Sequence, residues 1–173
     1  YSDRMKFFVL EIKKGYSGPQ IILSRTHPGL IKKMFEQEVP EISEGTVTIN
    51  AIVREAGSRT KMAVSSSDEK IDPIGACVGQ KGMRVNAVMG QMGDEKIDII
   101  KYSEDPAEFI ASALSPAKVS SVTVSDEEKS AFVTVPEYQL SLAIGKEGQN
   151  ARLAARLVGY KIDIKPESYQ EEE

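Results

Sequence analysis

The sequence predicts an α+β protein in which a unit of three strands and three helices occurs twice, behind a short β-hairpin. A Gly-x-x-Gly turn recurs 66 positions apart, at Gly79–Gly82 and at Gly145–Gly148. The tetrapeptide Lys-Ile-Asp-Ile follows both turns, at Lys96–Ile99 and Lys161–Ile164. Gly-x-x-Gly alone is weak evidence, because it occurs four times in this chain. The repeat of the whole pattern therefore carries the prediction.

A helix is expected after each turn, because apolar residues recur there with spacing i, i+3, i+4, i+7. The two stripes occupy matching positions, which are Val85, Val88, Met89 and Met92 in the first copy and Ala151, Ala154, Ala155 and Val158 in the second. The Lys-Ile-Asp-Ile segments alternate apolar and polar residues and contain β-branched side chains, which favours strands. Each copy thus contains helix, turn, helix and strand in that order.

A hairpin is predicted at the start of the chain. Residues Met5–Ile12 alternate apolar and polar side chains, Gly15–Pro19 supplies turn residues, and Gln20–Ser24 forms the returning strand. Two strands cannot bury a core alone, so the hairpin is interpreted as the end of an incomplete barrel or sheet. The alternative is a hairpin that packs on the segment that follows it.

The first repeated unit is expected to begin with a helix over Leu30–Val39 that Pro40 ends, with His27 as a helix-entry residue. A hairpin follows, with strands over Thr46–Val53 and Thr60–Ser65. Asp72 precedes Pro73 and caps the next helix. That short helix contains Cys77, which is interpreted as a small core residue.

The second unit repeats this order after a short joint, which should hold the two units nearly rigid. Asp105–Glu108 has the pattern of a capping box. Strands are expected over Val119–Val124 and Ser130–Val135, and Pro136 begins the next helix. Each unit is therefore predicted to follow the order α-β-β-α-α-β.

Composition narrows the possible functions. The net charge of −4 argues weakly against nucleic acid, because Glu167, Glu171, Glu172 and Glu173 account for it and form an acidic tail that is expected to fray. One Cys and one His exclude an internal disulfide and a zinc set. No apolar run approaches the roughly 20 residues of a membrane span, and no signal peptide opens the chain. A cytoplasmic protein without cofactors is expected.

This order of elements resembles the prokaryotic (type II) KH RNA-binding domain, present twice. The whole chain resembles the RNA-binding part of a family of bacterial transcription elongation, termination and antitermination factors. The segments that carry the match are Leu23–Leu30, Arg54–Lys61, Ala113–Val119 and Ile144–Ala154.

The resemblance implies a domain for each segment of the chain. Residues 1–25 would be the end of an OB-type RNA-binding barrel, 26–102 the first KH domain, 103–166 the second, and 167–173 the tail. It also implies as partners single-stranded nascent RNA, RNA polymerase and other transcription factors. The main polymerase-binding domain of that family is not part of this sequence. A monomer is expected.

The candidate RNA-binding residues are the two turns and the polar side chains near them. Glycine lets a sugar-phosphate backbone approach, and the following helix directs unpaired N–H groups at phosphates. Lys81 and Lys146 add charge, whereas Glu147 makes the second turn neutral, so Arg152 and Arg156 are expected to compensate. Amide side chains can read base edges of an unpaired strand. The full set is Gly79, Gln80, Lys81, Gly82, Arg84, Asn86, Gly145, Lys146, Glu147, Gly148, Gln149, Asn150, Arg152 and Arg156, with Arg54, Arg59 and Lys61 from the first hairpin.

Several functions compete at this point. The preferred hypothesis is noncatalytic binding of single-stranded RNA during transcription. The glycines could instead be mere helix caps in a degenerate KH fold that binds protein, or the chain could be a ribosome-associated or assembly scaffold. An enzyme is the poorest interpretation, because Gly79–Gly82 lacks the Lys-Ser/Thr ending of a nucleotide-binding loop and no catalytic set of side chains is present. With no Trp, an aromatic platform for bases is also disfavoured.

Overall fold

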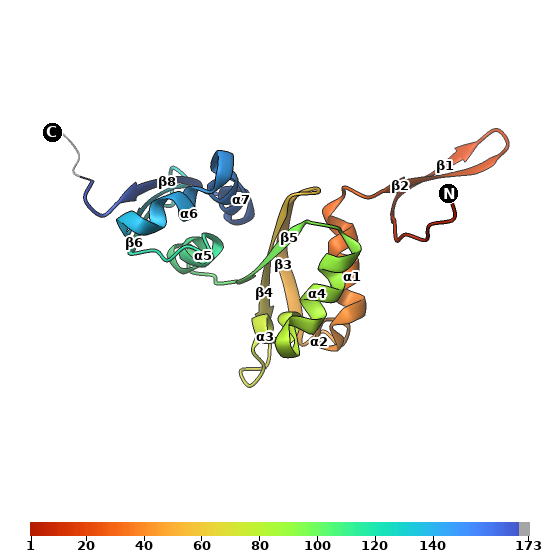
Figure 1. Ribbon diagram of the computed structural model, residues 1–173, viewed down its shortest axis with the longest axis horizontal. Coiled ribbons are helices and arrows are strands. Elements are labelled where there is room, and N and C mark those ends of the chain that lie inside the picture. The colour runs from red at the N-terminus through yellow and green to blue at the C-terminus, as the bar shows by residue number, and fades with distance from the viewer. Residues whose placement is uncertain (170–173) are drawn as a thin grey trace.

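The computed structural model describes residues 1–169 and contains the predicted unit twice, behind a hairpin (Figure 1). The hairpin consists of β1 (Phe8–Gly15) and β2 (Gly18–Ser24). The first unit comprises α1 (Pro28–Glu38), α2 (Pro40–Ser43), β3 (Val47–Glu55), β4 (Arg59–Ser66), α3 (Pro73–Val78), α4 (Met83–Gln91) and β5 (Lys96–Lys101). The second comprises α5 (Pro106–Ala113), β6 (Ser121–Ser125), β7 (Ser130–Val135), α6 (Leu140–Ile144), α7 (Gln149–Val158) and β8 (Lys161–Pro166). The predicted α+β class is confirmed.

Both units have the same three-stranded sheet. The strand orders are β3-β4-β5 and β6-β7-β8, and in each sheet the central strand pairs antiparallel with the first strand and parallel with the last. The parallel pairing aligns Thr60 with Ile97 in the first unit and Ala131 with Ile162 in the second. The Lys-Ile-Asp-Ile segments are therefore edge strands, reached from the central strand through the helix–turn–helix.

The starts of three helices follow the predicted capping residues. The backbone N–H of Gly29 donates to His27 Nδ1 at 2.9 Å, that of Ile74 to Asp72 at 3.1 Å and that of Ala107 to Asp105 at 3.0 Å. The capping box at Asp105–Glu108 is wrong in its second half. Glu108 accepts from the Ser103 hydroxyl, and the N–H of Asp105 donates to the same hydroxyl oxygen, because Ser103 lies between the two groups.

Pro40 ends one helix and begins another. The helix α1 stops at Glu38, one residue before the predicted end at Val39, and α2 starts at Pro40 itself. Proline suits the first position of a helix, since its missing N–H would have no partner there. The helix α2 was not predicted from the sequence, because Pro40 was interpreted only as the end of a helix.

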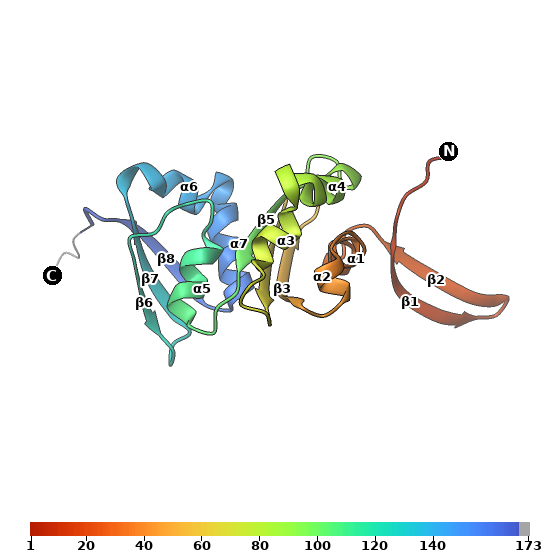
Figure 2. The ribbon, with the colours of Figure 1, turned by 90° about the horizontal axis from the view of Figure 1, so that it is seen from below.

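The two units pack as four layers. Figure 2 shows, in order, the β6–β8 sheet, the helices α5 to α7, the β3–β5 sheet and the helices α1 to α4. Side chains of β4 alternate between two cores: Met62 and Val64 lie in the core of the first unit, whereas Ala63 lies in the core built around the second. The helices of the second unit thus cover the outer face of the first sheet.

The buried Cys77 belongs to the core of the first unit. Its side chain is fully inaccessible, and burial raises the pKa of the thiol to about 11. A thiol that stays protonated and covered is a packing residue, which confirms its assignment from the sequence.

The hairpin does not pack on the segment that follows it. Its apolar residues Val9, Leu10, Ile12, Ile21 and Leu23 are each at least half exposed. Only Phe8 packs inward, with its ring stacked on the His27 ring at a centroid distance of 4.4 Å. The interpretation of a packed hairpin is therefore wrong. The hairpin and β8 lie at opposite ends of the molecule (Figure 1).

Among residues 1–169, no helix has the length and apolar character that crossing a membrane requires. The predicted acidic tail reaches position 173, and residues 170–173 lie outside the described part of the chain.

Candidate nucleic-acid interface

The two Gly-x-x-Gly loops have the same backbone conformation. Gly79 and Gly145 have φ, ψ of 76°, 170° and 79°, 170°, and Gly82 and Gly148 have 75°, 13° and 73°, 14°. These positive φ values favour glycine. A Cβ on Gly145 would lie 2.7 Å from the backbone nitrogen of Asn150, so a side chain cannot be added there without moving the main chain. The repeat seen in the sequence is thus a repeat of geometry.

The loops lead directly into the amino ends of α4 and α7, where the N–H groups of the first helical residues, Met83 and Gln149, donate to backbone oxygens of the loops. Neither helix has a side-chain cap, so no side chain accepts from their first N–H groups. The loop residues Gln80, Lys81, Lys146 and Glu147 are exposed. In Figure 2, α4 of the first unit and α6 of the second both lie along the upper edge of the molecule. Such a helix terminus with a nearby lysine suits a phosphate.

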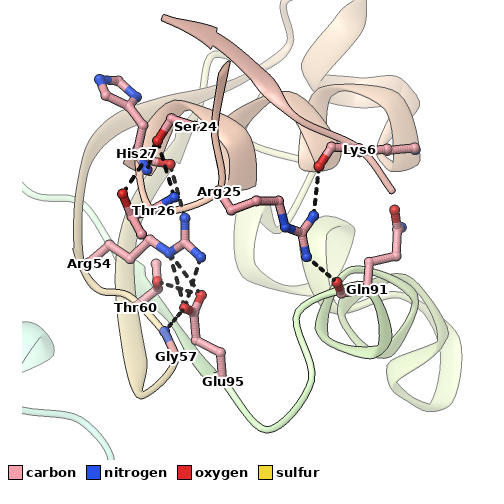
Figure 3. A network of polar contacts seen from close by, with 10 residues as sticks. All are labelled: Lys6, Ser24, Arg25, Thr26, His27, Arg54, Gly57, Thr60, Gln91 and Glu95. Atoms are coloured by element: carbon pink, nitrogen blue, oxygen red, sulfur yellow. Dashed lines mark hydrogen bonds and ion pairs between the residues drawn. The ribbon is translucent and has the colours of Figure 1, made fainter. Parts of the chain in front are cut away.

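Several predicted binding residues are held in other contacts. Arg54 is wrong as an exposed cation: its guanidinium is buried and ion-paired with Glu95 at 3.0 Å, and it also donates to the backbone oxygen of His27 (Figure 3). Lys61 is wrong for the same reason. Its ammonium is buried between Asp98, at 3.0 Å, and the backbone oxygen of Ser115, at 2.7 Å. Burial lowers the pKa of Lys61, and the Asp98 carboxylate opposes that effect.

The remaining predicted cations differ in their exposure and in whether they already form an ion pair. Arg59 pairs with Asp98 at 3.1 Å and is mostly buried, and Arg84 pairs with Glu41 at 2.8 Å while also donating to the backbone oxygen of Ala76. Arg152 pairs with Glu55 of the first unit at 2.6 Å. Of the cations predicted to bind RNA, those that are exposed and have no ion pair within residues 1–169 are Lys81, Lys146 and Arg156.

Of the three predicted amide side chains on the helices that follow the turns, Asn86 alone has no hydrogen-bond partner within residues 1–169 and is free for bases. Asn150 is 3% exposed, and its amide donates to the backbone oxygens of Leu114 and Ala143, at 3.0 and 2.9 Å. Its prediction as a base-reading group is wrong, because it joins the ends of α5 and α6 inside the second unit. Gln149 donates to Glu55 and to the Ser58 hydroxyl, both at 2.6 Å. Asn86 is exposed beside the first loop.

We expect Asn150→Ala to lower the free energy of unfolding by about 1–3 kcal/mol, because two buried carbonyl oxygens lose their donor. Urea denaturation measures this change. The matched variant Asn86→Ala removes an exposed amide and should stay within about 0.5 kcal/mol of the parent chain. Equal effects of the two substitutions would contradict the structural role of Asn150.

A groove of about 620 Å³ borders α3 and β5 of the first unit and reaches the second unit. Apolar side chains and two lysines line it, including Ile74, Ile99, Lys101, Pro116, Lys118 and Val119. A groove lined by apolar side chains and lysines can hold unstacked bases while contacting their phosphates. Lys101 and Lys118 were missed in the sequence, because only the docking of the two units brings them together.

A second groove, of about 430 Å³, lies between the loop of the second unit and the hairpin of the first. Its lining includes Gly57, Ser58, Arg59, Asp94, Lys96, Leu142 and Lys146. Lys96 was also missed. It occupies the same position in the Lys-Ile-Asp-Ile repeat as Lys161, and nothing in the sequence distinguishes the two lysines.

Family comparisons agree with this geometry. A model described as the NusA-like first KH domain matches residues 25–102, and a model of the NusA-like second KH domain matches residues 106–172. The chain belongs to the NusA-like KH family. Its two helix–turn–helix units are therefore KH domains of this family, in the order that the family models give.

Curated relatives carry the name "Transcription termination/antitermination protein NusA". The protein of Halalkalibacterium halodurans is 56% identical over 172 residues, which are 99% of this chain and 45% of that protein. The protein of Bacillus subtilis is 57% identical over 166 residues, 96% of this chain and 45% of that protein. The protein of Mycobacterium tuberculosis, strain H37Rv, is 55% identical, with coverages of 95% and 48%. The NusA-like chain thus spans about half the length of these relatives.

A solved structure is also similar. The crystal structure of APE1850 matches 78% of this chain and 95% of its own chain, with a TM-score of 0.55 and 25% sequence identity. The likeness supports the tandem arrangement of the two KH domains.

Proposed function

We propose that this NusA-like chain binds single-stranded RNA without catalysis, as the RNA-binding part of a bacterial transcription termination and antitermination factor. The observation that carries the proposal is the pair of loops with one backbone geometry, each of which contains an exposed lysine and leads into a helix without a side-chain cap. Two contacts at fixed spacing raise the effective concentration of the second, so overall affinity exceeds that of either loop.

The proposal assigns a domain to each segment of the chain. Residues 1–25 would complete an OB-type barrel, residues 26–102 and 103–166 would be the two KH domains, and 167–173 an acidic tail. The nascent transcript would be the ligand, and RNA polymerase and other transcription factors would be partners of the larger protein. A monomer in the cytoplasm fits this role. No observation favours the ribosomal scaffold.

Salt dependence tests the electrostatic part of this function. We expect affinity for a fluorescein-labelled pool of RNA, about 12 nucleotides long so that about four can lie at each loop, to fall steeply as salt rises. Lys81→Ala and Lys146→Ala should each reduce the slope of log K against log salt by about 0.7, because each removes one phosphate contact to a single strand. Fluorescence anisotropy over a salt series provides the measurement.

The control is Lys32→Ala, which removes an exposed lysine of α1 that has no ion pair in the described part of the chain. It should leave the slope unchanged. Equal slopes for all three variants would show that the loops do not contact phosphates, and the absence of RNA binding by the parent chain would refute the proposed function.

A further inference from the structure

The tip of the β3–β4 hairpin of the first KH domain contacts the loop region of the second. Glu55, the last residue of β3, accepts from Arg152 Nε through one carboxylate oxygen and from Gln149 Nε2 through the other, both at 2.6 Å. Gln149 and Arg152 lie in the first turn of α7, directly after the second loop. The Arg152 hydrogen bond lowers the pKa of the Glu55 carboxyl, which keeps it ionised. One carboxylate therefore joins the two domains at the second loop.

Arg152 extends this contact into the loop itself. Its Nη1 donates to the backbone oxygen of Glu147 at 3.0 Å. Glu147 has a positive φ of 54°, a backbone conformation that residues other than glycine adopt at a cost in free energy. A donor on its carbonyl oxygen helps to hold the strained peptide. Glu55 and Arg152 thus form a chain of contacts that ends on the main chain expected to meet phosphate.

The hairpin tip that carries Glu55 is itself fixed. The buried Glu95 carboxylate accepts from the Gly57 N–H at 2.7 Å and from Arg54 and Thr60, as Figure 3 shows. The backbone oxygen of Ser58 accepts from the N–H of Lys96 at 2.9 Å, which joins the tip to β5. The tip therefore has a defined position from which Glu55 can hold the second loop.

The first loop lacks this contact between domains, because the arginine in the first turn of α4, Arg84, pairs with Glu41 of its own domain at 2.8 Å. The residues 66 positions before Gln149 and Arg152 are Met83 and Asn86, and both are exposed. The two loops share their backbone but differ at these two positions, which are the positions that contact Glu55. The two loops therefore differ in the residues that make the interdomain contact and not in their backbone geometry.

If only its charge is considered, Glu55 should weaken RNA binding at the second loop. A carboxylate beside a phosphate-binding loop repels RNA, so its removal should strengthen binding if Glu55 does nothing else. We propose that Glu55 is a positioning residue for RNA at the second loop. It holds Arg152 and Gln149 so that the loop and the amino end of α7 are in place before RNA binds. The RNA affinity gained in this way exceeds the affinity lost through charge repulsion. The inference rests on the proposed RNA binding.

The test uses the whole chain and a pool of RNAs about four nucleotides long, which can occupy only one loop at a time. In an NMR titration, the Gly82 and Gly148 amide signals report the first and the second loop. Glu55→Ala is expected to weaken binding at Gly148 about 5- to 10-fold, within the usual range of coupling between sites, and to leave Gly82 unchanged. The unchanged first loop also shows that the variant is folded.

A double-mutant cycle separates positioning from direct contact. Arg152→Gln should weaken binding at Gly148 by a similar factor, and adding Glu55→Ala to it should cause little further loss, because the two side chains act as a unit. Glu55→Gln keeps an oxygen for Arg152 and should fall between the parent chain and Glu55→Ala. The matched control is Glu38→Ala, which removes an exposed carboxylate at the end of α1 that has no polar partner among residues 1–169.

The outcomes distinguish the inference from the function on which it rests. Stronger or unchanged binding at Gly148 in Glu55→Ala would overturn the positioning role, and so would losses from Glu55→Ala and Arg152→Gln that simply add. If the parent chain shifts neither glycine signal, the proposed RNA binding fails instead.

Discussion

Replacing Gly82 and Gly148 together with aspartate is expected to abolish RNA binding and to leave the fold intact. A Cβ on Gly148 meets nothing within 4 Å, and one on Gly82 meets first the flexible end of Asn86, at 3.2 Å. Aspartate is among the residues that tolerate the left-handed backbone found there. The new carboxylates would repel phosphate at both helix termini, so we expect at least a roughly 100-fold loss as both contacts and their avidity disappear.

The control for this pair is asparagine at the same two positions, which has the same shape and backbone tolerance without the charge. Anisotropy measures affinity, and circular dichroism checks the fold. We expect the asparagine variant to retain most of its affinity. If the aspartate variant binds as well as the asparagine one, phosphate does not approach these helix ends. Gly79 and Gly145 are poorer choices, because a Cβ there crowds Arg84 and Asn150.

Glu95→Ala should be the most destabilising single substitution among the polar residues discussed. The Glu95 side chain is 0% exposed and its partner Arg54 is 2% exposed, so removal leaves an uncompensated buried guanidinium. The Gly57 N–H and the Thr60 hydroxyl would lose their acceptor as well (Figure 3). Breaking a buried pair in this way typically costs about 3–5 kcal/mol of unfolding free energy. Equilibrium denaturation in urea provides the measurement.

The exposed ion pair Lys33–Glu36 on α1 serves as the comparison for the buried pair Arg54–Glu95. Its nitrogen–oxygen distance is 2.9 Å, similar to that of the buried pair, but the Lys33 side chain is 65% exposed. Glu36→Ala should therefore change stability by no more than about 0.5 kcal/mol. A loss below about 1 kcal/mol for Glu95→Ala would mean that water reaches Arg54 and that the hairpin tip is less fixed than the contacts indicate.

Local patterns predicted most of the elements. Alternation identified the strands, the apolar stripes after Gly82 and Gly148 identified α4 and α7, and Asp72 and Asp105 marked helix starts. The sequence analysis placed the two loops correctly for the same reason, because glycine at both ends of a turn is a local requirement. These features depend on residues within about one helical turn of each other.

The predictions that were wrong concern residues whose contacts lie in other segments of the chain. Arg54, Lys61 and Asn150 have the chemistry of binding residues, but each is buried by segments between 7 and 54 positions away, as their hydrogen bonds show. The same docking makes Lys96, Lys101 and Lys118 neighbours of the grooves. No pattern along the chain predicts which face of β4 the second domain will cover. The positions and turn geometry of the two loops were therefore predicted from the sequence, whereas the contacts of the residues around them were not.

The packing of the second domain's helices on the outer face of the first sheet has a consequence for synthesis of the protein. The face of the first sheet that carries Ala63 and Ile100 gains its cover only from residues after position 105. While a ribosome is still translating those residues, the finished first domain has a bare apolar surface. A truncated chain that stops before α5 would keep this apolar surface exposed permanently.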